Sequence, residues 1–103
     1  MQIGWVGGLN RSETYLTSMA TAAGHKLEFH NGDVRGNGFK GLRRLVNRSS
    51  FVIILITINS HQGVQLTKRL AHKHNCPSIV MQRCGRSSFR QLLAAINQPD
   101  SKL

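Results

Sequence analysis

The sequence predicts an α/β fold, a single four-stranded parallel sheet in the order 2-1-3-4 with helices on both faces. Two observations predict it. Residues 51–57 form a continuous apolar, mostly β-branched run, as in a strand buried on both faces. A natural helix cap, Asn59-Ser60, and a helical pattern follow at once, and such strand–helix units recur four times. Right-handed crossovers between the units give a doubly wound parallel sheet.

The first strand–helix unit is expected to start at residue 3. Residues 3–6 predict the strand, and the pair Gly7-Gly8 ends it, because two glycines permit a tight turn with close approach of the backbone. Asn10, followed by Glu13 three residues later, has the spacing of a capping box. Apolar residues at intervals of three and four then predict a helix.

The second unit opens with alternating polar and apolar residues over 26–30, which predict a half-buried edge strand. The glycine-rich segment Asn31–Gly38 is the longest break in the chain and the best candidate for a mobile loop. A helix over 39–48 follows. Its outward side chains are basic, and they are Lys40, Arg43, Arg44 and Arg48.

The third unit joins the buried strand 51–57 to a helix over 61–75. Pro77 marks a new start, and residues 78–82 predict the fourth strand. The last helix is expected to begin at Ser88, which has capping-box spacing to Gln91. Residues 1–97 then form one domain, and residues 98–103 a frayed tail.

The net charge and the cysteines indicate the kind of partner and the cellular compartment. Fourteen lysines and arginines face four acids, and a net charge of +10 attracts polyanions, with nucleic acid the first candidate partner through Arg43, Arg44 and Arg48. Cys76 and Cys84 flank a predicted strand and are too far apart to bridge, and unpaired thiols fit a reducing compartment. Without a signal peptide or an apolar run of membrane-spanning length, we expect a cytoplasmic protein that does not enter the membrane. Two open sheet edges predict a homo-oligomer.

The carboxyl ends of the predicted strands meet at one edge of the sheet, where doubly wound proteins bind ligands. Helix N-termini open on the same edge with the positive end of the helix dipole. Together with arginines they predict a site for a small anion such as a phosphate or carboxylate. The expected binding residues are Gly7, Gly8, Asn10, Arg11, Ser60, His61 and Arg86. No G-x-G-x-x-G spacing and no P-loop lysine is present, which disfavours a classical NAD or ATP site.

Two alternatives stay open. His61 and His30 fall at the same edge, two strands or roughly 10 Å apart, so a heme- or metal-binding role through His61, with His30, Met81 or Cys84 as a further ligand, is the first. Nucleic-acid binding is the second. Catalysis is disfavoured, because only Asp33 among the acids falls near the edge, although neighbouring arginines would favour a Cys84 thiolate. The leading interpretation is a non-enzymatic ligand-binding or sensor domain.

Several short motifs resemble one bacterial family. They are Val6-Gly7-Gly8, Phe29-His30-Asn31-Gly32, Ser60-His61 with Lys68 and Ala71 after it, Pro77, and the helix start Ser87-Ser88-Phe89. Over residues 3–96 the chain is similar to the bacterial domain of unknown function 2325. The resemblance implies a Rossmann-like or flavodoxin-like sheet with these motifs gathered at one site. It implies no reaction.

Overall fold

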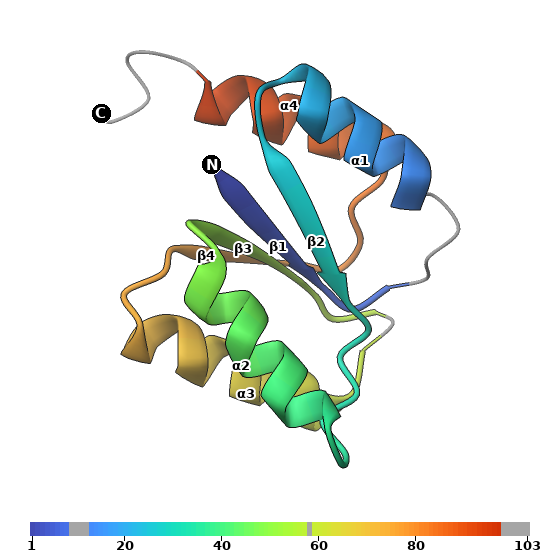
Figure 1. The fold of residues 1–103 in the computed structure, drawn as a ribbon. Coiled ribbons are helices and arrows are strands. Elements are labelled where there is room, and N and C mark those ends of the chain that lie inside the picture. The colour runs from blue at the N-terminus through green and yellow to red at the C-terminus, as the bar shows by residue number, and fades with distance from the viewer. Residues whose placement is uncertain (9–12, 58, 98–103) are drawn as a thin grey trace.

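Strands and helices alternate along the whole chain in the computed structural model, which describes residues 1–8, 13–57 and 59–97 (Figure 1). In chain order the elements are β1 (Gln2–Val6), α1 (Glu13–Ala22), β2 (Lys26–His30), α2 (Gly38–Arg48), β3 (Phe51–Leu55), α3 (His61–Lys73), β4 (Ser78–Met81) and α4 (Arg86–Ile96). The four strands form one sheet in the order β2-β1-β3-β4, and every neighbouring pair is parallel. The predicted fold class is confirmed.

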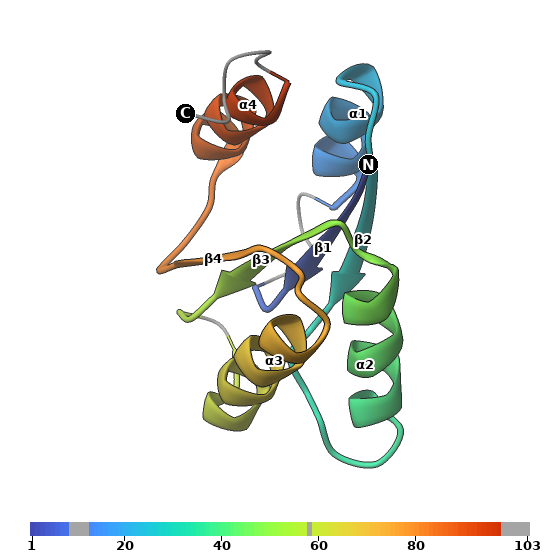
Figure 2. The same ribbon diagram turned by 90° about the vertical axis from the view of Figure 1, so that its left-hand side faces the viewer.

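Two helical layers cover the sheet, α1 with α4 on one face and α2 with α3 on the other (Figures 1 and 2). A hydrophobic core lies on each face of the sheet, and the central strand β3 contributes side chains to both, because successive side chains of a strand point to opposite faces. Ile53 and Leu55 pack under α1 and α4, whereas Val52 and Ile54 pack under α2 and α3. This two-sided burial explains the continuous apolar run in the sequence.

The ends of three elements differ from the prediction by two residues or more. β3 stops at Leu55 rather than at residue 57, because β1 ends beside Ile54 and leaves Ile56 with 41% of its surface exposed. α3 stops at Lys73 rather than at residue 75, just before Asn75 takes a positive φ of 54°. α4 begins at Arg86 with Gly85 as its cap, three residues before the expected cap Ser88. The Phe89 N–H accordingly donates to the Gly85 carbonyl at 3.0 Å. The Ser88 cap is therefore wrong.

The other structural expectations concern the sheet edges, the cysteines, the membrane and the cap at Asn10. β2 is an edge strand as predicted, and β4 is the other edge. Cys76 and Cys84 are both free. Among the described residues no helix has the length and apolar character needed to cross a membrane. The predicted cap at Asn10 lies outside the described residues.

Candidate functional site

A pocket of about 370 Å³ lies at the carboxyl edge of the sheet, next to the ends of β1 and β3. The connections after these two strands lead to opposite faces, so the pocket sits at the topological switch point, the usual ligand position in doubly wound sheets. We call it the switch-point pocket. Its lining residues are Gly8, Asn31, Asp33, Val34, Arg35, Asn59, Ser60 and Gln62.

The turn after β1 forms the inner wall. Gly7 and Gly8 have φ values of 97° and 87°, a conformation that side chains other than glycine rarely adopt. The Gly7 N–H donates to the His30 carbonyl at 2.8 Å and so extends the pairing of β1 with β2. A Cβ on Gly7 would lie 2.6 Å from Nδ2 of Asn59. Gly7 therefore lies behind the pocket, and Gly8 lines it.

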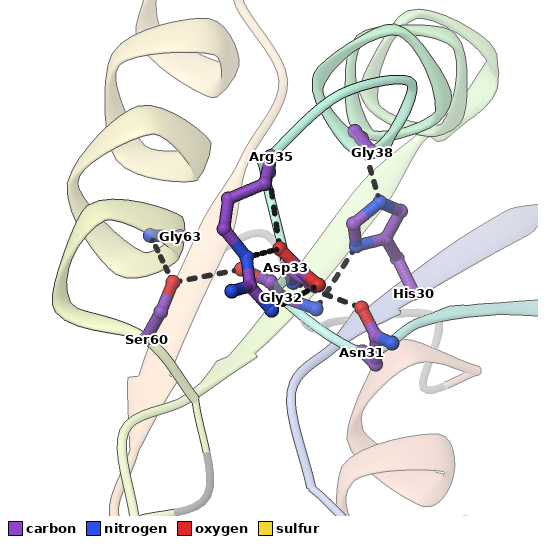
Figure 3. Close-up of polar contacts among 8 residues, drawn as sticks. All are labelled: His30, Asn31, Gly32, Asp33, Arg35, Gly38, Ser60 and Gly63. Atoms are coloured by element: carbon purple, nitrogen blue, oxygen red, sulfur yellow. Dashed lines mark hydrogen bonds and ion pairs between the residues drawn. The ribbon is translucent and has the colours of Figure 1, made fainter.

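The imidazole of His30 holds the loop 31–38 at two points (Figure 3). Its Nδ1 accepts a hydrogen bond from the Gly32 N–H at 2.9 Å, and its Nε2 lies 2.9 Å from the Gly38 carbonyl oxygen. With Nδ1 as the acceptor, Nε2 is the nitrogen that donates to the Gly38 carbonyl. A metal ion at either nitrogen would replace one of these bonds.

Inside the loop, Asp33 organises the backbone (Figure 3). Its N–H donates to Oδ1 of Asn31 at 2.8 Å, and its carboxylate accepts from the Arg35 N–H at 3.0 Å and from the Arg35 guanidinium at 3.0 and 3.1 Å. These hydrogen bonds from Arg35 lower the pKa of Asp33 from 3.8 to about 2. At neutral pH the carboxylate is charged and paired, and the Arg35 side chain stays 88% exposed.

Ser60 joins this loop to α3 (Figure 3). Its Oγ accepts from the Gly63 N–H at 2.8 Å, which confirms the predicted helix cap, and donates to the Gly32 carbonyl, also at 2.8 Å. Asn59 joins the strand ends, since its Nδ2 donates to the carbonyls of Leu55 at 2.7 Å and Val6 at 3.4 Å. Its Oδ1 is buried without a donor partner among the described residues.

The sequence-predicted binding residues are not all in one place. Gly8 and Ser60 line the switch-point pocket, but His61 lines a neighbouring groove and is exposed. Arg86 stacks over the Tyr15 ring at 4.3 Å, between α4 and α1. Asn10 and Arg11 lie outside the described residues. Anion binding at these positions remains a prediction.

The sequence did not point to five of the pocket residues. Asn31, Val34 and Arg35 belong to the loop 31–38, where only Asp33 was expected near the edge, and Asn59 and Gln62 lie on either side of the start of α3. A positional signal was available, because Asn31 directly follows β2 and Asn59 directly precedes the α3 cap.

The geometry gives no support to the metal and thiolate alternatives. No group of three or more His, Cys, Asp or Glu side chains within the described part of the chain is placed to hold a metal ion. Burial raises the pKa of the Cys84 thiol, which is the reverse of the activation expected from neighbouring arginines. Heme or metal binding through His61 and His30 remains a prediction.

The sheet order defines a small doubly wound α/β architecture, with a candidate site in the pocket at its switch point. Residues 2–96 match the family described as an uncharacterized protein conserved in bacteria (DUF2325), and the chain belongs to this family. The match spans nearly the whole chain and confirms the resemblance seen in its motifs. No curated protein and no solved structure is significantly similar to the chain.

Proposed function

We propose that the protein is a non-enzymatic domain that binds a small anion, a phosphate or carboxylate compound, in the switch-point pocket. One observation carries the proposal. The first turn of α3, through Ser60 and Gln62, and the side chain of Arg35 converge on the same pocket. The Arg35 side chain is 88% exposed, although two of its three guanidinium nitrogens donate to Asp33. Helix N-termini and guanidinium groups are the protein groups that most often bind such anions.

The start of α3 supplies the donors. The Oγ and carbonyl of Ser60 accept from the N–H groups of Gly63 and Val64, at 2.8 and 3.0 Å. The helix itself provides no acceptor for the N–H groups of His61 and Gln62, which lie at the positive end of its dipole. The net charge of +10 adds a long-range field that attracts anions to the protein.

The pocket is better suited to binding than to proton transfer. Asp33 is the one carboxylate among the described lining residues, and its pKa of about 2 leaves it ionised at neutral pH. A general acid or base works best with a pKa near the operating pH. The nearby His30 has both ring nitrogens engaged by the loop backbone. These features favour a sensor or carrier role.

Calorimetric titration with inorganic phosphate and with citrate tests the proposal. The Gln62→Glu variant places a negative charge at the start of α3, and we expect it to weaken anion binding at least tenfold. Gln91→Glu on α4 is the matched control, because Gln91 is exposed on the other helical layer and outside the pocket. It should bind like the wild type. The proposal would be overturned if neither phosphate nor citrate binds, or if the two variants bind with equal affinity.

An absorbance spectrum of the freshly purified protein distinguishes heme binding from binding of a small anion. A Soret band that disappears in His61→Ala would assign His61 as an axial ligand and count against an anion at the α3 start. A spectrum of protein alone, with calorimetric binding of phosphate or citrate, supports the anion site.

A further inference from the structure

The outer surface of the α2–α3 layer carries only positive charge. The two helices lie side by side on one face of the sheet (Figure 2). Their sequences, over 38–48 and 61–73, contain no aspartate or glutamate. Their exposed cations are Lys40, Arg43, Arg44 and Arg48 from α2, and Lys68, Arg69 and Lys73 from α3.

Most of this charge is not neutralised within the protein. Arg48 pairs with Glu28 on the neighbouring strand β2. The other cations of the layer have no carboxylate partner among the described residues, where the one further ion pair joins Asp33 to Arg35. Like charges held on one surface repel each other, so a polyanion that binds there would relieve this repulsion.

A groove of about 420 Å³ lies between the start of α2 and the first half of α3, and we call it the α2–α3 groove. It is lined by Val34, Phe39, His61, Gln62, Gln65, Leu66 and Arg69. The Phe39 ring is half-buried in it, and the Arg43 guanidinium lies 5.8 Å from the ring centroid. An aromatic ring, guanidinium groups and glutamine amides together offer stacking, charge and hydrogen bonds to bases.

We propose that the α2–α3 groove binds single-stranded nucleic acid, with a base against Phe39 and phosphates on Arg43 and Arg69. This interaction surface extends beyond the arginines expected from the sequence. It adjoins the small-anion site, with which it shares Val34 and Gln62.

The surface fits a single strand better than other polyanions. The large exposed apolar side chains among the described residues are Met1, Tyr15, Ile56 and Val80, and none belongs to α2 or α3. A membrane-binding surface needs such side chains to insert between lipids. Both helices lie flat against the sheet, so neither projects as a recognition helix does into a major groove (Figure 2).

Fluorescence anisotropy with a labelled oligouridylate of about 16 nucleotides tests the proposal. We expect the double variant Arg43→Glu/Arg69→Glu to lose at least tenfold in affinity. Lys26→Glu/Arg90→Glu is the matched control, since it changes the net charge equally at exposed positions on β2 and α4. It should change affinity by less than about threefold, the long-range part of the charge effect.

Phe39→Leu separates stacking from charge. It keeps an apolar side chain in the groove and removes the ring, and stacking of one base is worth about 1–3 kcal/mol, or roughly 5- to 150-fold in affinity. Raising salt from about 50 to 200 mM should weaken wild-type binding steeply, and the arginine double variant should show a shallower salt dependence.

Three results would overturn the proposal. They are equal affinities in the two double variants, binding that does not respond to salt, and tighter binding of a duplex or of anionic lipid vesicles than of the oligouridylate. Circular dichroism melts of each variant establish that it is folded. Because the four charged side chains substituted in the two double variants are exposed, we expect the melting temperatures of these variants to be close to that of the wild type.

Discussion

The two helical layers of the protein differ in their cores and in their outer surfaces. Under α1 and α4 the core contains aromatic rings among its aliphatic side chains, with the Trp5 ring centroid 5.4 Å from that of Phe89 and 5.9 Å from that of Phe29. Under α2 and α3 the buried core is aliphatic apart from Cys76. The outer charges of α1 and α4 are mixed, one glutamate with two arginines, whereas those of α2 and α3 are all positive.

This contrast indicates a division of roles between the layers. Large aromatic side chains bury the most apolar surface per residue, so the α1–α4 side anchors the fold. The α2–α3 side carries six cations without a carboxylate partner among the described residues. The loop 31–38 and the start of α3 shape both candidate sites beside it. If the roles are divided, substitutions on the two sides should have separable effects on stability and binding.

The largest effect is expected on the aromatic side. Phe89 is fully buried, and Phe89→Ala should lower the free energy of unfolding by about 3–5 kcal/mol through lost burial and a cavity. Urea denaturation measures this loss, and Phe89→Leu, which leaves a smaller cavity, should lose clearly less. Under conditions where the variant is folded, oligonucleotide affinity should be unchanged. Weaker binding by the folded Phe89→Ala protein would contradict the division of roles.

A smaller loss of stability is expected at Ser60, which joins the loop 31–38 to α3. Ser60→Ala removes the α3 cap and the hydrogen bond to the Gly32 carbonyl, and it should cost about 0.5–2 kcal/mol. Hydrogen exchange should become faster at the Gly63 amide. The control Ser87→Ala changes an exposed serine in the first turn of α4 and should cost less than about 0.5 kcal/mol. Equal losses in the two variants would mean that the Ser60 bonds contribute nothing.

The smallest effect concerns the exposed pair within the loop 31–38. Hydrogen bonds from Arg35 lower the pKa of Asp33 from 3.8 to about 2, so the pair's contribution is complete above pH 3.8 and is lost as pH falls through about 2. The loop contact should therefore be constant across neutral pH. An NMR titration of the Asp33 carboxyl should give a midpoint near 2. In Arg35→Gln the midpoint should rise but stay below 3.8, because the backbone N–H of residue 35 still donates to the carboxylate. A wild-type midpoint near 3.8 would show that the contact does not form in solution.

Most of the fold could be predicted from the sequence, because the strongest patterns have a single stable solution. The apolar run that forms β3 over 52–55 is buried on both faces, which requires helices on each side of the sheet. The Ser60 cap could be predicted because its partner lies three residues away. Ser88 has the same spacing, but Gly85 starts α4 one turn earlier, and a local pattern cannot show which of two starts packing will favour.

The candidate site could be predicted only to the level of the sheet edge. Neighbouring residues of a helix point in directions roughly 100° apart, so His61 lines the α2–α3 groove although Ser60 lines the switch-point pocket. The stacking of Arg86 on Tyr15 depends on how α1 and α4 pack. The bonds of His30 depend on the path of the loop, which no short pattern specifies.

The two bonds of the His30 ring have an evolutionary consequence. The ring bridges the Gly32 amide and the Gly38 carbonyl, so both hydrogen bonds can form only when the segment between these residues has its present length. An insertion or deletion between residues 32 and 38 would move one anchor out of reach. Among family members this histidine and an unchanged segment length should therefore be inherited together, and a chain that varies the length should have replaced the histidine.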